Sequence, residues 1–278
     1  MTVRTIFRMT VSTSSPSPYM GDLQFINLNQ TGGVLTATLN RPKANAFDET
    51  MVEELISVLK TAQENDSVRC LVLTGSGRFF SAGQDVTGFN REEVSFREHL
   101  HRTYNRVITK MHGLEKPIVG AINGPAVGAG LGVALATDLR VAAESAIFIY
   151  GFVGIGLSAD SGTSLAMPLL IGLARSVEMA FTNRPITAQE ALEWGLVNEV
   201  VPDDQLEEAV NELASKLAKG PTRALGLSKR AIHHASLASL SETLEFEAEL
   251  QEIAGQTEDH AEGVAAFLEK REPKFQGK

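Results

Sequence analysis

The run Gly124-Pro125-Ala126-Val127-Gly128-Ala129-Gly130-Leu131-Gly132 decides the fold of this chain. It lies in an uncharged stretch, residues 117–137, that contains two prolines and five glycines and is therefore a poor bilayer helix. We interpret it as a buried strand at 118–122, a Gly/Pro turn, and a helix starting near Gly128. Glycines there let backbone approach a ligand, and the free N–H groups of a first helical turn can bind an anion or oxyanion. A close helix–sheet contact that needs small residues explains the run equally well.

The composition narrows the class of protein. The chain has 278 residues, of which 43% are hydrophobic and 21% are charged, and this suits a globular protein with a large core. A net charge of −9 argues against nucleic acid as a partner, and we expect no membrane association. Cys70 is the only cysteine, which rules out an intrachain disulfide and favours a reducing compartment such as the cytoplasm. Residues 1–20 are expected to be a disordered extension, or alternatively a transit peptide to the mitochondrial matrix.

Strands alternate with helices along most of the chain, which predicts an α/β domain. The expected elements are strands at 23–28, 34–39, 70–74, 118–122, 139–142, 146–148 and 197–201, a helix N-capped by Asp48, one long helix along 96–111, a short helix with a Thr187/Glu190 capping box, and later helices near 206–217, 241–254 and 259–271. We therefore predict an α/β core at 21–202 and a helical region at 203–278.

A second glycine-bearing loop, Phe80-Ser81-Ala82-Gly83-Gln84-Asp85, follows the strand at 70–74 just as the central run follows its own strand. Two such loops at neighbouring strand ends can aim two N–H groups at one oxygen and stabilise an enolate or a tetrahedral oxyanion. Neither loop matches a nucleotide-binding pattern, and we expect no metal. The acidic run at 242–252 is expected to be a solvated helix face. The histidines expected at the surface are His99, His101, His112, His233, His234 and His260.

Four segments together resemble the enoyl-CoA hydratase/isomerase (crotonase) family. They are Asn40-Arg41-Pro42-Lys43-Ala44-Asn45-Ala46-Phe47, the loop at 80–85, residues 115–130, and Phe267-Leu268-Glu269-Lys270-Arg271. The resemblance spans about residues 21–278. It implies a spiral of ββα units followed by a helical trimerisation region, a homotrimer or a dimer of trimers, and an acyl-CoA substrate with no cofactor beyond its coenzyme A.

The resemblance also implies site residues. It places the two oxyanion-binding N–H groups on Gln84 and Ala129, and coenzyme A along Lys43-Ala44 and Ala82-Gly83, with Lys270 near its phosphates. Lys43 and Lys270 can alternatively be plain surface lysines. The substrate-binding residues implied are Lys43, Ala44, Ala82, Gly83, Gln84, Asp85, Val86, Ala129 and Lys270.

Two departures from the family pattern bear on the reaction. Hydratases of this family carry two glutamates, at positions where this chain has Gly132 and Phe152, so a general acid/base pair for hydration is missing. Instead, Asp160 is an isolated acid in an apolar segment, where burial would raise its pKa. This resembles Δ3,Δ2-enoyl-CoA isomerases, including 1,2-epoxyphenylacetyl-CoA isomerases, which have an acid at this position.

We therefore predict an enoyl-CoA isomerase whose catalytic residues are Gln84, Ala129 and Asp160. Asp160 can also be the N-cap of a helix at 161–171. Hydration or other enolate chemistry, and a non-catalytic acyl-CoA-binding protein, remain the alternatives.

Overall fold

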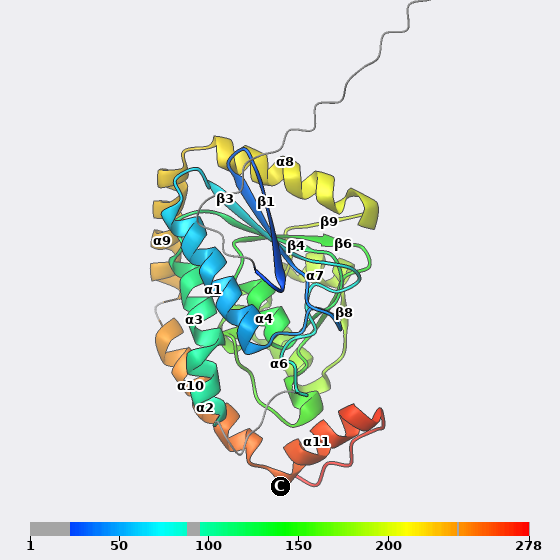
Figure 1. The fold of residues 1–278 in the computed structure, drawn as a ribbon. Coiled ribbons are helices and arrows are strands. Elements are labelled where there is room, and N and C mark those ends of the chain that lie inside the picture. Colours follow the sequence, from blue (N-terminus) through cyan, green and yellow to red (C-terminus); the bar gives the residue numbers. More distant parts are fainter. Residues whose placement is uncertain (1–22, 88–94, 238, 278) are drawn as a thin grey trace, which may run out of the picture.

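The computed structural model describes residues 23–87, 95–237 and 239–277, so the expected extension at 1–20 lies outside the described part. Its main layer is a six-stranded sheet with the strand order β1-β2-β3-β4-β6-β9 (Figure 1). The strands are β1 Ile26–Thr31, β2 Val34–Leu39, β3 Cys70–Gly75, β4 Ile118–Ile122, β6 Leu139–Ala143 and β9 Glu199–Val201. The first two form the expected antiparallel hairpin, and the later pairings in this sheet are parallel.

A second sheet of three short strands adjoins the loops that follow β3 and β4. It consists of β5 Ala126–Val127, β7 Ile147–Ile149 and β8 Ile186–Thr187. β5 was not expected, because its two residues lie inside the Gly/Pro turn of the central run. They are nevertheless paired on both sides, with β7 and with a bridge to Ser81. This pairing fixes the turn that leads into the next helix.

Helices cover both faces of the main sheet. They are α1 Glu49–Glu64, α2 Phe96–Arg102, α3 Tyr104–Gly113, α4 Ala129–Leu135, α5 Thr163–Ile171, α6 Leu173–Thr182, α7 Ala188–Trp194, α8 Leu206–Lys219, α9 Thr222–Ser236, α10 Leu240–Gly255 and α11 Glu258–Glu269, with 3₁₀ turns η1 Phe152–Ile155 and η2 Asp203–Gln205. The larger core packs α1, α3 and α4 on one face, and a smaller core packs α8 on the other (Figure 1).

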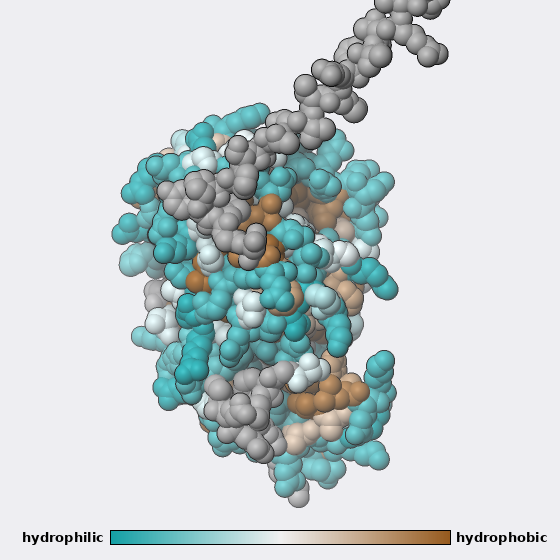
Figure 2. All heavy atoms as spheres, viewed as in Figure 1, coloured by the Kyte–Doolittle hydropathy of each residue, from teal (hydrophilic) through white to brown (hydrophobic). Residues whose placement is uncertain are grey.

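The outer surface is mixed in character. On the face drawn in Figure 2, most side chains are hydrophilic, and apolar atoms reach the surface near α11. None of the described helices is both long and apolar enough to cross a bilayer.

Local capping signals confirm several expected boundaries. Asp48 N-caps α1, with its carboxylate accepting a hydrogen bond from the Met51 N–H at 2.8 Å. The capping box of Thr187 and Glu190 begins α7, and Gly195 ends it in the left-handed region.

The expectation of one long helix along 96–111 was wrong, because the structure has two helices there, α2 and α3. The break lies at Thr103, with φ −113° and ψ −97°, and its hydroxyl donates to the His99 carbonyl at 2.6 Å. Apolar periodicity continues through the break, so spacing alone could not reveal it.

The C-terminal part is helical, as expected, but it contains one helix that the sequence analysis missed. This is α9, in which Gly226 is the one buried residue among those described. A β-carbon at Gly226 would lie 2.2 Å from the Glu115 carbonyl oxygen, so α9 packs through backbone rather than through an apolar stripe. The division of the chain at 202/203 remains a prediction.

Candidate active site

The loop after β3 presents the backbone N–H of Gln84 to one side. Phe47 donates to the Gly83 carbonyl at 2.7 Å and accepts from the Asp85 N–H at 2.8 Å, forming a parallel bridge opposite Gln84. In such a bridge the middle residue's own N–H points away from its partner. Within the described part of the chain, no hydrogen bond satisfies this N–H.

Ala129 supplies a second backbone N–H close by. As the first residue of α4, it has no partner for its N–H inside the helix, and none is found among the other described residues. The two loops are in contact at Gly83, where an added β-carbon would lie 2.7 Å from the Val127 carbonyl and 3.4 Å from the Ala129 nitrogen. Gly83 also has φ +85°, in the region that favours glycine. A glycine here therefore keeps the space in front of Ala129 open.

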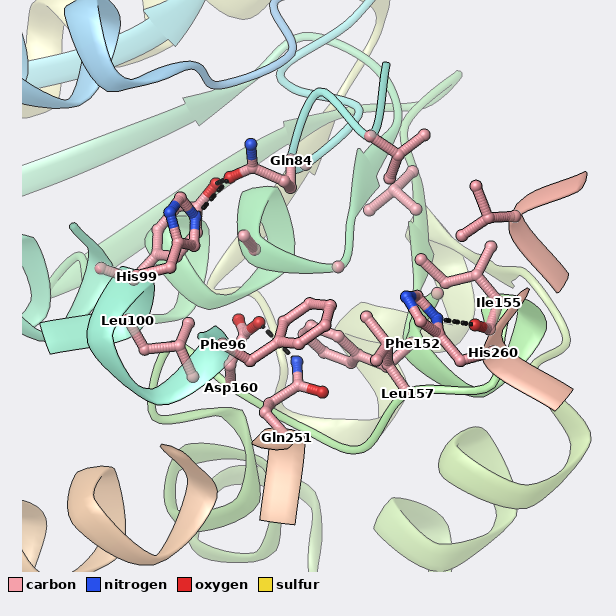
Figure 3. A pocket seen from close by; sticks show the side chains of 18 of the residues that line it. Gln84, Phe96, His99, Leu100, Phe152, Ile155, Leu157, Asp160, Gln251 and His260 are labelled. Carbon is pink, nitrogen blue, oxygen red and sulfur yellow. Dashed lines mark hydrogen bonds between the residues drawn. The ribbon is translucent and has the colours of Figure 1, made fainter. Parts of the chain in front are cut away.

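Both residues line a cavity of about 410 Å³ (Figure 3). Its walls are mostly apolar, and its lining residues come from both loops, from α2, α3, η1 and the following segment, and from α10 and α11. The apolar side chains that line it include Val86, Phe96, Leu100, Val127, Phe152, Ile155, Leu157, Val264 and Phe267. The helix α11 forms one wall of the cavity and packs on η1, where β-carbons at Gly156 and Gly263 would lie 2.8 Å from backbone of the opposite element.

Asp160 brings a carboxyl group into this cavity. It is 7% exposed, its Oδ1 accepts from the Ser161 hydroxyl at 2.6 Å, and its Oδ2 accepts from Gln251 Nε2 at 2.8 Å. Burial raises the pKa of the Asp160 carboxyl to about 7, and the charge of Glu247 adds to this, while the two hydrogen bonds lower it. The group can therefore take up and release a proton near neutral pH.

The helix α10 holds the loop that carries Asp160. Glu247 accepts from the Gly162 and Ser164 N–H groups at 2.8 and 2.9 Å, and Gln251, one turn later, binds Asp160. Glu247 is 2% exposed, so the expectation of a wholly solvated acidic face on α10 was wrong for this residue. The N-cap interpretation of Asp160 was also wrong, because Gly162 is the N-cap of α5 and Glu247 satisfies its N–H.

The two positions where hydratase glutamates were expected are occupied differently. A β-carbon at Gly132 would lie 2.3 Å from the Ser161 β-carbon, so this position has no room for a longer side chain. Phe152 lines the cavity and packs edge-to-face on Tyr150, with ring centroids 5.0 Å apart. Gly132 thus makes room for Ser161, which binds Asp160.

The side chain of Gln84 is held by two residues that the sequence analysis did not assign to the site. Its Oε1 accepts from the Tyr104 hydroxyl at 2.6 Å and lies 3.0 Å from His99 Nε2. Burial lowers the pKa of His99 and raises that of Tyr104. His99 and His260 are 6% and 5% exposed and line the cavity, so their expected surface placement was wrong. Among the described residues, no group of three His, Cys, Asp or Glu side chains could hold a metal ion.

The other implied binding residues lie at or outside the cavity. Ala82, Gly83 and Val86 line it. Ala44 accepts from the Ala82 N–H at 3.0 Å, which joins the loop of Lys43 to the edge of the cavity.

The remaining residues point elsewhere. The Asp85 carboxylate pairs with Arg41 at 2.7 Å instead of facing the cavity. Lys43 is exposed, and exposed Lys270 ends α11 with φ +55°, and neither lines the cavity.

Comparisons with known proteins, by sequence and by structure, all point to the same protein family. A family model described as enoyl-CoA hydratase/isomerase matches residues 29–278. The chain is 40% identical to 1,2-epoxyphenylacetyl-CoA isomerase of Escherichia coli K12, covering 92% of this chain and 100% of the relative. It is 39% identical to a probable enoyl-CoA hydratase of Rhodobacter capsulatus, covering 88% and 95%. A crystal structure of an enoyl-CoA hydratase from Mycobacterium avium subsp. paratuberculosis superposes with a TM-score of 0.84 at 31% identity, covering 92% and 100%.

Proposed function

Because the chain belongs to the enoyl-CoA hydratase/isomerase family and has the α/β crotonase fold, we propose that it is an enoyl-CoA isomerase in which Asp160 is the single base. The observation that carries this proposal is the position of one buried carboxyl, with its pKa raised to about 7, in the cavity that Gln84 and Ala129 also line.

The N–H groups of Gln84 and Ala129 form the oxyanion hole in this proposal. The thioester oxygen accepts both hydrogen bonds while negative charge develops on it. Each such donor contributes about 10²–10³ in rate when it is fixed in advance. Support comes from the Gln84 and Ala129 N–H groups, which have no acceptor among the described residues, and from the contact of the two loops at Gly83.

Asp160 moves the proton. It removes a proton from C2 of a 3-enoyl thioester, and the electron pair of that C–H bond is delocalised into a dienolate held at the thioester oxygen. The same carboxyl then returns the proton to C4, so the double bond moves from C3–C4 to C2–C3 with no net gain or loss of atoms. A pKa near 7 suits both steps. At neutral pH the carboxyl is present both in its ionised form, which can take up a proton, and in its protonated form, which can give one up.

Hydration is the alternative reaction, and the names of the relatives include both activities. It requires a second acid or base to activate water. Gly132 and Phe152 supply none, and a side chain at 132 would collide with Ser161. We therefore place isomerisation first.

Coenzyme A binding and assembly follow the same reasoning. We propose that the coenzyme A part of the substrate lies along the joined loops of Ala44 and Ala82, with Lys43 and Lys270 at its phosphates. The reaction needs no cofactor beyond this coenzyme A. The exposed stripe Leu173, Val177 and Phe181 on α6, from 40% to 82% exposed, supports a contact with another protein chain. For that assembly we propose the homotrimer or dimer of trimers that the family resemblance implies. A cytoplasmic location remains our proposal from the cysteine content.

Parallel assays distinguish the candidate functions. Purified protein is incubated with 3-hexenoyl-CoA and with crotonyl-CoA, and the products are separated by chromatography. We expect 3-hexenoyl-CoA to be converted to 2-hexenoyl-CoA and crotonyl-CoA to be hydrated slowly if at all. Brisk hydration of crotonyl-CoA with 3-hexenoyl-CoA untouched contradicts the proposal. Binding of both thioesters without turnover indicates a non-catalytic protein.

A further inference from the structure

Within the described part of the chain, the side chain of Gln251 uses one end of its amide for a hydrogen bond and leaves the other end without one. Its Nε2 donates to Asp160 Oδ2 at 2.8 Å, whereas its Oε1 is buried and has no partner among the described residues. The residue is only 1% exposed and lines the cavity. Figure 3 shows the amide nitrogen turned to Asp160 and the oxygen turned away from it, toward Phe152 and Leu157. A buried carbonyl without a donor costs free energy, so this arrangement needs an explanation.

The two ends of the amide match the two protonation states of a carboxyl group. An ionised carboxylate accepts hydrogen bonds only, and the Nε2–H group satisfies it in the orientation seen here. A protonated carboxyl has an O–H donor that needs an acceptor. A half-turn of the Gln251 amide would bring Oε1 to the place of Nε2 and supply that acceptor. The atom that is unpaired in one state is then the one used in the other.

We propose that Gln251 is a positioning residue that holds Asp160 in both of its protonation states by turning its amide between them. The inference rests on the proposed function, in which Asp160 takes up a proton and returns it within one turnover. Gln251 acts through Asp160. It keeps the carboxyl in place while the charge on that carboxyl appears and disappears.

The charge environment makes this hydrogen bond important. The groups around Asp160 are Ser161 beside it, Glu247 and Gln251 on α10, Tyr104 on α3 and Tyr150 after β7, and the cavity is also lined by His99 on α2 and His260 on α11. No lysine or arginine of the described chain lines the cavity. The ionised carboxylate is therefore stabilised mainly by the hydrogen bonds from Ser161 and Gln251, and removing one of them should make ionisation harder.

The helix α10 provides a rigid base for this contact. Glu247 lies one turn before Gln251 and accepts from the N–H groups of Gly162 and Ser164. The helix therefore binds the Asp160 loop through two side chains, Glu247 and Gln251. At the C-terminal end of α10, a β-carbon at Gly255 would lie 2.1 Å from the Phe96 ring, which shows close packing against α2. The backbone of position 251 is thus fixed, and only the terminal amide needs to turn.

The experiment compares pH profiles of kcat/KM for the double-bond shift in two isosteric variants. Gln251→Met keeps the length of the side chain but removes both hydrogen-bonding atoms. We expect the acid limb to move up by about one pH unit and kcat to fall about tenfold, because the ionised base has lost a donor. Gln251→Glu keeps the shape of the side chain, and the second carboxyl that it places beside Asp160 should raise the acid limb further.

The control is Gln256→Met, which replaces an exposed glutamine whose Nε2 donates to Glu252 at 2.9 Å. It should reproduce the wild-type profile.

The outcomes separate this inference from the proposed function. If both Gln251 variants keep the wild-type acid limb while Asp160→Asn abolishes turnover, the positioning role is wrong and the proposed function stands. If Asp160→Asn keeps the wild-type rate, the proposed function itself fails. If Gln251→Met does not fold, the Gln251→Glu profile decides, and a wild-type acid limb in that variant overturns the inference.

Discussion

Gly132 and Ser161 are packed so closely that a β-carbon at position 132 would lie 2.3 Å from the Ser161 β-carbon. Ser161 in turn binds Asp160, so a glycine of α4 supports the carboxyl of the candidate site. Gly132→Ala should displace Ser161, lower the free energy of unfolding by about 1–3 kcal/mol, and reduce kcat. Urea denaturation and steady-state kinetics measure the two effects. Gly113→Ala, where nothing lies within 4 Å of the added carbon, is the control. If both variants behave alike, this contact does not support Asp160.

The space between the two loops is sensitive to a single methyl group. Gly83→Ala should lower kcat about 10²-fold or more. Its β-carbon would press on the Val127 carbonyl and the Ala129 nitrogen, which border the place where we expect the thioester oxygen to bind. Gly77→Ala is a matched control, since Gly77 also has positive φ (+66°) but has nothing within 4 Å of an added carbon. It carries the same kind of backbone strain without the contact. Equal kcat in the two variants argues against an oxyanion hole at this place.

The pH dependence follows from the protonation state of Asp160. The base must be ionised in the free enzyme, and burial raises its pKa to about 7. We therefore expect kcat/KM for the double-bond shift to rise from pH 5 to pH 8, with its midpoint near 7. Initial rates in buffers of constant ionic strength give this profile. A flat profile from pH 5 to 8 is inconsistent with Asp160 as the base.

Asp160 should reduce stability at alkaline pH. Its pKa is about 7 when folded and about 3.9 when unfolded, so the folded state binds more protons between these values. Its contribution to stability is therefore present at low pH and is lost as the pH rises through 7. Asp160→Asn should gain thermal stability relative to wild type at pH 8, with a smaller gain at pH 4.5. Melting temperatures measured at both pH values check this. If the melting temperature of Asp160→Asn relative to wild type is lower at pH 8 than at pH 4.5, this expectation is wrong.

The sequence predicted the parts of the site that have local signals. The loops of Gln84 and Ala129 each contain glycine after a buried strand, and Asp160 is conspicuous as a lone acid in an apolar segment. These features reflect local backbone geometry and burial, which short stretches of sequence encode.

The parts that were missed depend on contacts between distant segments. Gln251 lies 91 residues from Asp160, in a helix rich in glutamate that suggested solvent exposure. Nothing in its own pattern shows that α10 returns to the Asp160 loop. The same holds for His99 and Tyr104, because the break at Thr103 that divides α2 from α3 leaves no mark in the apolar spacing.

The rate of the double-bond shift in Asp160→Asn addresses the central claim most directly. Asparagine keeps the size of the side chain but cannot accept a proton at neutral pH. We predict that conversion of 3-hexenoyl-CoA to 2-hexenoyl-CoA at pH 8 falls by about 10²–10⁴ in this variant while the protein stays folded. Conversion at the wild-type rate would show that another group carries the proton.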